Sequence, residues 1–331
     1  MKIAVDDMLL TKDMPTSAGS KMLDGYMSLF DATAVTKLRE GGFEIVGKAP
    51  VGEMGIDVCG ETCYKGKADT VSALKEADAA VCFDVNGAPR RIAAQNGLIF
   101  IKPTYGTVSR FGTVSAVCSG ECVGVMAKTA SECKTVLSAI VGKDENDGTM
   151  HADEVCKKAV SDTKSIKKVA CLSMGADLSD TKAALADLGI EVTEIPAGVI
   201  ESANAAWNIL MCAELCNNVS RFDGIKYGYR TPNYKNLDEL YTNSRTEAFG
   251  DLLKTAIIYG SDALSSANYM SRYDKSLRVR RVIVEALGKI LSEYDAVMLP
   301  VFFSFCLHEE PDGPVVVFFV YRKLCFYRTG F

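Results

Sequence analysis

Short apolar runs alternate with amphipathic stretches from residue 2 to residue 195, and this alternation limits the fold more than any other feature of the sequence. Residues 2–5, 79–83 and 98–101 are apolar runs of strand length, whereas residues 65–77 and 129–141 carry apolar side chains at helical spacing. A further helix is predicted after Asp31, which we expect to be its N-cap. Continuous apolar strands suit a sheet that is buried on both faces. The sequence therefore predicts an α/β architecture in which helices cover the sheet.

The pattern changes twice further along the chain. Residues 203–294 are mostly helical, and residues 296–300 return to an apolar, strand-like run. After residue 301 there is little periodicity, and 7 of the 14 phenylalanines fall in the last 30 residues. We expect one domain over residues 1–300 and an unrelated, Phe-rich and poorly ordered tail over residues 301–331.

Charge and hydropathy exclude several classes of protein. The net charge is −5 and the isoelectric point is about 5.3, so we expect no direct nucleic-acid-binding surface, which would need clustered positive charge. No apolar run reaches the roughly 20 residues that span a bilayer. The chain does not begin with a basic stretch followed by an apolar run, which is the pattern of a secretory signal peptide. We therefore expect a cytoplasmic location and no membrane association.

The 12 cysteines and 2 histidines give little support for a metal site. Structural zinc sites favour closer C-x-x-C pairs. We interpret the cysteines as reduced thiols that pack in the core, and we expect neither a metal nor a cofactor. The alternative is that pairs four residues apart share a helical face and bind metal, and three such pairs occur: Cys59/Cys63, Cys118/Cys122 and Cys212/Cys216.

Several runs of the sequence resemble the amidase signature family. Residues 101–112, IKPTYGTVSRFG, carry the resemblance most clearly, and residues 220–230, SRFDGIKYGYR, extend it. Within the family the chain is most similar to the A subunits of tRNA-dependent amidotransferases. The resemblance covers roughly residues 2–300. It implies a single α/β domain on a mixed twisted sheet flanked by helices on both faces, here truncated at both ends.

The resemblance also implies a chemistry. Family members hydrolyse or transfer amides with a Ser–Ser–Lys triad, in which one serine attacks the amide carbon and a second relays its proton to a neutral lysine. Backbone N–H groups beside the nucleophile hold the oxyanion. In the tRNA-dependent enzymes the amide is that of glutamine, and the ammonia passes to a B-type partner subunit that works with a small C-type subunit.

The residues at the triad positions differ from those of the family. The family's lysine lies in an A-V-K-D motif, and Asp6 occupies that position here. Counting back from Lys102 places Ala88 at the nucleophile, and the same register places Tyr64 at the relay serine. Alanine has no nucleophilic atom, and an aspartate, with a reference pKa of about 3.9, carries the wrong charge for the lysine's role.

The oxyanion region differs as well. Val85, Asn86 and Gly87 stand where the family has Thr-Gly-Gly, so one glycine remains. Lys65 is one position from the relay serine, but we interpret it as a solvated residue at a helix N-terminus. Ser109, Cys118 and Ser119 lie near the region in sequence, and each would also need a base and an oxyanion hole to act as a nucleophile.

Arg280 is the candidate substrate-binding residue. It matches an arginine that, in the family, contacts the carboxylate of glutamine, a task suited to bidentate guanidinium pairing. It also lies among Lys275, Arg278 and Arg281, so an exposed cation on a helix is an equal alternative.

These observations predict a degenerate homologue of the amidotransferase A subunit that no longer hydrolyses amides. One alternative is a working A subunit that releases ammonia from glutamine. A second is a non-catalytic binding or regulatory partner of the amidotransferase complex, which grips a partner subunit, glutamine or another small amide. A third is a decaying gene product that scarcely folds.

Overall fold

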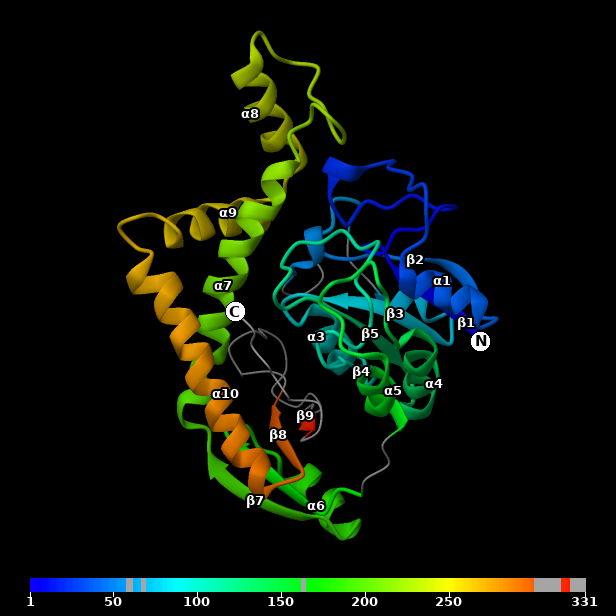
Figure 1. Ribbon diagram of the computed structural model, residues 1–331, viewed down its shortest axis with the longest axis vertical. Coiled ribbons are helices and arrows are strands. Elements are labelled where there is room, and N and C mark those ends of the chain that lie inside the picture. The colour runs from blue at the N-terminus through cyan, green and yellow to red at the C-terminus, as the bar shows by residue number, and fades with distance from the viewer. Residues whose placement is uncertain (58–61, 67–69, 162–164, 301–316, 322–331) are drawn as a thin grey trace. The chain divides into compact units, whose positions relative to one another are not determined.

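The computed structural model describes residues 1–57, 62–66, 70–161, 165–300 and 317–321 (Figure 1). Its residues divide into two compact units. The first unit comprises Met1–Val160 and Met211–Asn268. The second comprises Ser161–Leu210 and Tyr269–Phe331.

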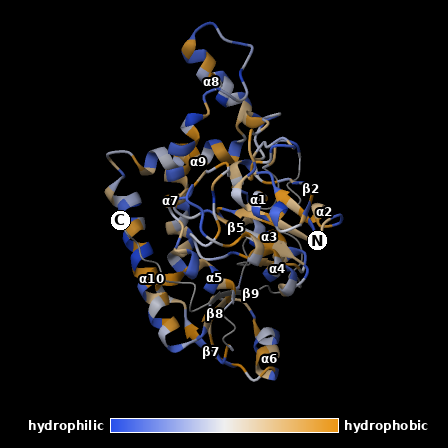
Figure 2. Cartoon of the chain, turned by 45° about the vertical axis from the view of Figure 1, so that its right-hand side comes forward, coloured by the Kyte–Doolittle hydropathy of each residue, from blue (hydrophilic) through white to orange (hydrophobic). Residues whose placement is uncertain are grey.

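A five-stranded mixed sheet forms the centre of the first unit, with the strand order β2-β1-β3-β5-β4. β1 is parallel to both β2 and β3, whereas β5 is antiparallel to both β3 and β4. Hydrophobic residues, orange in Figure 2, gather along these strands. The strands are β1 (Lys2–Asp6), β2 (Glu44–Ala49), β3 (Ala79–Asp84), β4 (Ile99–Ile101) and β5 (Cys122–Ala127).

Helices cover both faces of this sheet. Ala4, Ala80 and Cys82 point to one face and pack with Leu74, which follows α2 (Thr70–Ala73), and with Ala93 of α3 (Ala88–Gln95). The alternate strand residues point to the opposite face. There α4 (Ala130–Ile140) packs on β5 and against α1 (Thr33–Glu40).

The remaining helices of the first unit follow in the second half of the chain, apart from α5 (Asp153–Ser161). Single turns of 3-10 helix lie at Lys21–Leu23, Glu53–Gly55 and Val219–Arg221. The longer helices are α7 (Ala203–Asn218), which begins in the second unit, α8 (Leu237–Ala248) and α9 (Asp251–Ala263).

The second unit has a four-stranded mixed sheet in the order β7-β6-β8-β9. Its strands are β6 (Lys168–Ser173), β7 (Glu191–Pro196), β8 (Ala296–Pro300) and β9 (Val317–Tyr321). One face packs against α10 (Lys275–Glu293) and the turn Gly198–Ser202, and the other against α6 (Ser179–Asp187) and its flanks. The predicted α/β class, with mixed sheets flanked by helices, is confirmed.

Several local predictions need correction. The sequence favours Asp31 as the cap of α1, but the N-cap is Ala32, and the Asp31 carboxylate instead accepts from Lys12 N at 2.9 Å. The helix expected over residues 65–77 is limited to Thr70–Ala73 among the described residues. β5 is not among the strands predicted from the sequence, whereas α9 lies within residues 203–294, which are predicted to be mostly helical. Most of the tail over residues 301–331 lies outside the described residues, so the domain boundary at residue 300 stays a prediction.

Candidate functional site

Two of the predicted triad positions lie at one edge of the five-stranded sheet. Asp6 is the last residue of β1, and Ala88 begins α3, four residues after β3 ends at Asp84. β1 and β3 are neighbouring parallel strands, with Val5 paired to Val81. Because the carboxyl ends of parallel strands meet at the same edge, the fold brings both positions to this edge.

The Asp6 side chain connects the two strands where their ladder ends. Its Oδ2 accepts from the backbone N–H of Phe83 at 2.9 Å, and its Oδ1 accepts from Met8 N at 2.7 Å. Complete burial raises the pKa of the Asp6 carboxyl to about 7, against the lowering effect of these two donors. At neutral pH position 6 therefore holds a carboxyl that is partly protonated and already bonded to the backbone, whereas the resemblance predicts a lysine amine at this position in the family.

A second, partly buried cluster lies next to Asp6. Lys48 Nζ is 3.8 Å from Asp7 Oδ1 and 3.0 Å from Thr16 Oγ1, and the Asp7 carboxylate also accepts from Ser17 N at 3.1 Å. Burial lowers the pKa of Lys48, and the neighbouring Asp7 opposes this shift. The cluster contains an amine and hydroxyls, but the amine is held as the partner of Asp7 and of the backbone carbonyl of Leu9.

Two residues beside this cluster have left-handed backbones. Ala18 has φ 50° and Met54 has φ 53°, and Met54 N donates to Ala18 O at 2.8 Å. L-residues other than glycine rarely adopt this conformation. Both residues are completely buried, so the surrounding structure holds the two turns in place.

Apolar side chains fill the space in front of Gly55. A Cβ added there would lie 3.0 Å from Val85 Cγ2, 3.4 Å from Met8 Cε and 3.5 Å from Phe83 Cδ1. Met8, Phe83 and Val85 are each at most 2% exposed. Val85, one of the predicted oxyanion residues, is therefore part of the core.

The oxyanion region is held by a buried carboxylate. Asp84 Oδ1 accepts from Gly87 N at 2.7 Å, and its Oδ2 lies 2.7 Å from Arg90 Nε and 3.6 Å from Lys102 Nζ. Burial alone would raise the pKa of Asp84, but Arg90, Lys102 and Gly87 N–H outweigh it and lower the pKa to about 2. The N–H of Gly87 is thus bonded to Asp84. Pro89, directly after Ala88, has no N–H to offer.

Asn86 faces a different neighbour. Its Nδ2 donates to Asp57 O at 2.8 Å, and Arg91 donates to the carbonyls of Asn86, at 2.9 Å, and of Asp57, at 2.6 Å. This network fixes the turn before α3 to the segment that carries Asp57. The Asn86 side chain therefore has a structural bond that a glycine at this position could not make.

Tyr64 reaches the same edge through its backbone. Its N–H donates to Gly19 O at 3.1 Å, and the residue before Gly19, Ala18, donates to Asp7 O at 3.2 Å. The hydroxyl points elsewhere and bonds to Asp24, which also pairs with Lys65 Nζ at 3.3 Å. Lys65 is exposed, as expected of a solvated residue.

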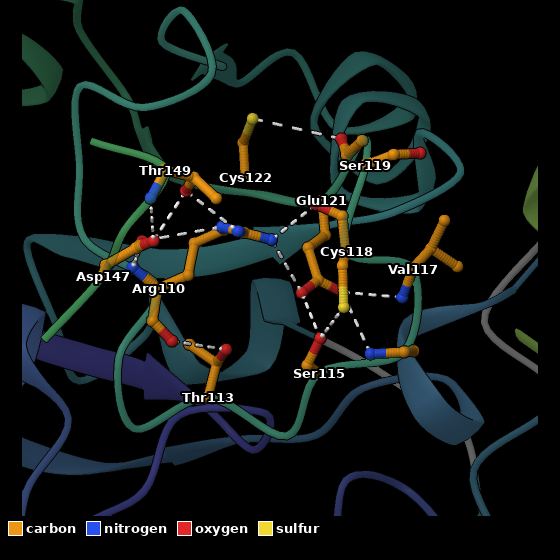
Figure 3. A network of polar contacts seen from close by, with 12 residues as sticks. Arg110, Thr113, Ser115, Val117, Cys118, Ser119, Glu121, Cys122, Asp147 and Thr149 are labelled. Atoms are coloured by element: carbon orange, nitrogen blue, oxygen red, sulfur yellow. Dashed lines mark hydrogen bonds and ion pairs between the residues drawn. The ribbon is translucent and has the colours of Figure 1, made fainter. Parts of the chain in front are cut away.

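The motif over residues 101–112 builds a polar network beside this edge (Figure 3). Arg110 Nη1 lies 3.1 Å from Glu121 Oε1, and Arg110 Nη2 donates to Thr149 Oγ1 at 3.0 Å. Glu121 is completely buried and accepts from the N–H groups of Ala116, at 2.9 Å, and Val117, at 2.8 Å. The family motif thus serves to fix the chain around residues 115–121.

The three candidate replacement nucleophiles lie in or near this network. Ser109 Oγ donates to Asp144 Oδ2 at 2.6 Å, and the Ser119 hydroxyl bonds to Glu214. Cys118 is exposed, and its Sγ lies 3.1 Å from Ser115 Oγ. Both serine hydroxyls therefore donate to carboxylates with structural roles, and none of these three contacts supplies an amine base.

Arg280 is half-buried on α10, in the second unit, and makes no hydrogen bond or ion pair among the described residues. No group of three or more His, Cys, Asp or Glu side chains that could hold a metal occurs in the part of the chain that is described. Cys59 lies outside that part, and Cys122 is on a strand rather than a helix. Nor does any helix in the described ranges combine the length and apolarity that a membrane crossing needs.

Sequence reasoning missed the contacts that organise the edge. The Lys48–Asp7 pair and the Asp84–Arg90 pair join residues 41 and 6 positions apart, and the Asp6–Phe83 bond joins residues 77 positions apart. The sequence feature that could have indicated these contacts is the presence of charged residues in otherwise apolar strands. Such residues are seldom fully buried unless they are paired.

Comparison with known proteins identifies the family. The model of the Amidase family matches residues 1–71 and 66–323, and the chain therefore belongs to this family. The second match continues past residue 300. The predicted membership is confirmed.

Among the members of this family, the chain is similar to A subunits of glutamyl-tRNA(Gln) amidotransferases. The A subunit of the glutamyl-tRNA(Gln) amidotransferase of Maridesulfovibrio salexigens is 34% identical over 330 residues, covering 90% of this chain and 68% of that protein. The corresponding A subunit of Latilactobacillus sakei is also 34% identical, covering 96% of this chain and 72% of that protein.

Solved structures agree on the fold. The A subunit of the Thermotoga maritima glutamyl-tRNA(Gln) amidotransferase superposes with a TM-score of 0.65 at 25% identity, covering 94% of this chain and 70% of that one. Kluyveromyces lactis allophanate hydrolase gives a TM-score of 0.73 at 20% identity, covering 95% and 51%, and this likeness concerns the fold alone.

Proposed function

We propose that this chain is a pseudoenzyme of the amidase family, derived from the A subunit of the tRNA-dependent amidotransferase and without amide hydrolysis. The observation that carries the proposal is the edge where β1 and β3 end. There a buried carboxyl, Asp6, is bonded to two backbone N–H groups, and Ala88 offers only a methyl group.

The chemistry of the edge supports the same conclusion. An acyl-enzyme needs a nucleophilic atom, which Ala88 lacks, and a base that accepts its proton. Both oxygens of Asp6 already accept hydrogen bonds from the backbone, and Ala88 offers no hydroxyl proton that this carboxyl could take up. Gly87 N–H, the remaining glycine donor of the oxyanion region, is bonded to Asp84 at 2.7 Å. In subtilisin, removal of the nucleophile alone lowers the rate about 10⁶-fold.

The role that remains is binding within an amidotransferase complex. The relatives are named as subunits, and in this chain the motif over residues 101–112 is held in place by the pairing of Arg110 with the buried Glu121. We propose B- and C-type subunits as partners in the cytoplasm, with glutamine as a ligand that Arg280 would hold by its carboxylate. The competing function is a working A subunit.

An ammonia-release assay separates the two functions. The purified chain is incubated with glutamine or asparagine, alone and with the B- and C-type subunits of Latilactobacillus sakei, and the intact A subunit of the same organism serves as the positive control. We expect no release above buffer from this chain. Turnover that Arg280→Ala abolishes would show a working amidase and refute the proposal.

Partner binding is measured in parallel. We expect this chain to co-purify with the C-type subunit and to compete with the intact A subunit for it. A monomer that binds neither subunit would refute the binding role, and a broad, non-cooperative thermal melt would instead indicate a decaying product.

A further inference from the structure

The segment of residues 225–235, which leads into α8, is basic and aromatic. It carries Lys226, Arg230 and Lys235 and no acidic residue, although the net charge of the whole chain is −5. Tyr227 and Tyr234 lie in the same segment. It belongs to the first unit and leads into the helix labelled α8 in Figure 1.

The three cations of this segment are available to a ligand. Lys226, Arg230 and Lys235 are exposed, and none of them forms an ion pair among the described residues. Arg230 Nη2 donates to the Tyr234 hydroxyl at 3.2 Å, and its guanidinium lies 5.5 Å from the centre of that ring. The contact joins a cation and an aromatic ring without neutralising the charge.

The acidic residues around the segment are used to hold its backbone. Asp223 Oδ1 accepts from Ile225 N at 2.8 Å, and Glu239 Oε2 accepts from Lys235 N at 2.8 Å. Glu247 Oε2 accepts from the Tyr229 hydroxyl at 2.6 Å. The carboxylates thus fix the shape of the segment without forming an ion pair with its cations among the described residues, and Asp223 attracts Lys226 only at longer range.

The tyrosine rings are exposed but held. Tyr227 is 41% exposed and packs edge-on against Phe222, with 5.9 Å between the ring centres. Tyr234 is 44% exposed and is fixed by Arg230. Rings that are already ordered lose little side-chain entropy when a partner stacks on them.

We propose that residues 225–235 bind an unpaired nucleic-acid strand, with phosphates on Lys226, Arg230 and Lys235 and bases stacked on Tyr227 and Tyr234. Single-strand sites combine a cationic track with aromatic platforms in this way. An acidic peptide would satisfy the cations but offers no flat rings for the tyrosines. The proposal departs from the expectation drawn from overall charge, because that charge conceals a local cluster, and it does not depend on the proposed function.

The test measures binding of a fluorescent 15-mer oligo(U) RNA to the full chain by anisotropy, as a function of salt. Three phosphate contacts on a single strand predict a slope of log affinity against log salt of about −2. The triple variant Lys226→Gln/Arg230→Gln/Lys235→Gln should lose at least about tenfold in affinity and most of this slope. Tyr227→Leu/Tyr234→Leu should lose about tenfold or more and keep the slope, whereas Tyr227→Phe/Tyr234→Phe should bind like the parent.

The matched control removes three exposed lysines of the same unit that also form no ion pair among the described residues, Lys128, Lys134 and Lys158. Affinity of this Lys→Gln triple variant close to that of the parent supports the proposal, and an equal loss overturns it. No binding of oligo(U) at 50 mM salt, or displacement of oligo(U) by poly-glutamate at equal charge concentration, also overturns it. Comparison with oligo(dT) separates RNA from DNA, since only RNA offers a 2′-hydroxyl. Thermal melts verify that each variant is folded.

Discussion

The carboxylate of Asp6 accepts a hydrogen bond from the backbone N–H of Phe83 at 2.9 Å and so extends the contact between β1 and β3 beyond their last paired residues, Val5 and Val81. Asp6, which we predict to stand at the family's lysine position, is therefore part of the scaffold in this chain. Its protonation should affect the stability of the fold rather than a reaction rate.

Asp6 should make stability depend on pH. Its pKa is about 7 in the folded chain and 3.8 as a free side chain, so the folded state favours the protonated form. The stabilisation is complete below pH 3.8 and is lost as the pH rises through 7. We expect the free energy of unfolding to fall by about 2–3 kcal/mol between pH 5 and pH 8, and Asp6→Asn to remove most of this fall.

Urea unfolding at several pH values measures this effect. The control is Glu194→Gln, which removes an exposed carboxylate paired with Lys182 at 2.6 Å and should leave the slope between pH 5 and pH 8 unchanged. An unchanged pH dependence in Asp6→Asn would contradict the role assigned to Asp6.

Asp84 should stabilise the fold through its two cations. Asp84→Asn leaves Arg90 and Lys102 without their buried counter-charge, so we expect a loss of about 3–5 kcal/mol in unfolding experiments at pH 7. Asp153→Asn breaks an exposed pair with Lys157 and should change the stability far less, because solvent screens that pair. Equal losses in the two variants would show that the pairs of Asp84 contribute no more to the free energy of unfolding than an exposed ion pair does.

Gly260 should be essential to the contact between α9 and α7. A Cβ at this position would lie 2.0 Å from the carbonyl oxygen of Cys212, so Gly260→Ala forces the two helix backbones apart. We expect a loss of about 3 kcal/mol in the free energy of unfolding. Gly288 is also inside a helix but has nothing within 4 Å, and Gly288→Ala should gain about 0.5–1 kcal/mol from helix propensity. A tolerated Gly260→Ala would mean that α9 does not pack this closely.

Cys118 should be the fastest-labelled thiol among the described cysteines, because it alone of these is exposed. Burial raises the pKa of Cys133 and of Cys212 to about 11, so both should react only after unfolding. Maleimide labelling of the native chain followed by peptide mapping checks this order. Cys118→Ser should remove the fast-reacting peptide, whereas Cys133→Ser should leave the native labelling pattern unchanged.

The α/β class could be predicted because apolar strands and amphipathic helices leave periodic patterns in the sequence. Individual helices and strands were harder to predict where contacts between distant residues determine the local structure. Ala32 rather than Asp31 caps α1, because the Asp31 carboxylate bonds to Lys12 N and pairs with Arg39 Nε at 3.3 Å. β5 contains Gly124, a poor strand residue, because a Cβ there would lie 2.5 Å from Ile101 O on the neighbouring strand.

The assignment of the candidate site to these positions stays a prediction, and the contacts that build the site could not be predicted from the sequence. Counting along the motif placed Asp6 and Ala88, and the parallel strands bring both to one edge of the sheet. The Asp6–Phe83 bond could not be predicted, because it joins residues 77 positions apart and exists only once the sheet has formed. Tyr64 illustrates the same limit, since its hydroxyl bonds to Asp24 rather than pointing to a position that the motif defines.

The left-handed backbones of Ala18 and Met54 have a practical consequence. Each costs roughly 1–3 kcal/mol, a cost that glycine does not incur. Ala18→Gly removes only a methyl group, so we expect this variant to have a higher free energy of unfolding than the parent chain. That variant is a starting point for engineering, in which a lysine and two serines are introduced at positions 6, 64 and 88, the predicted triad positions, and their combined effect on amide cleavage is measured.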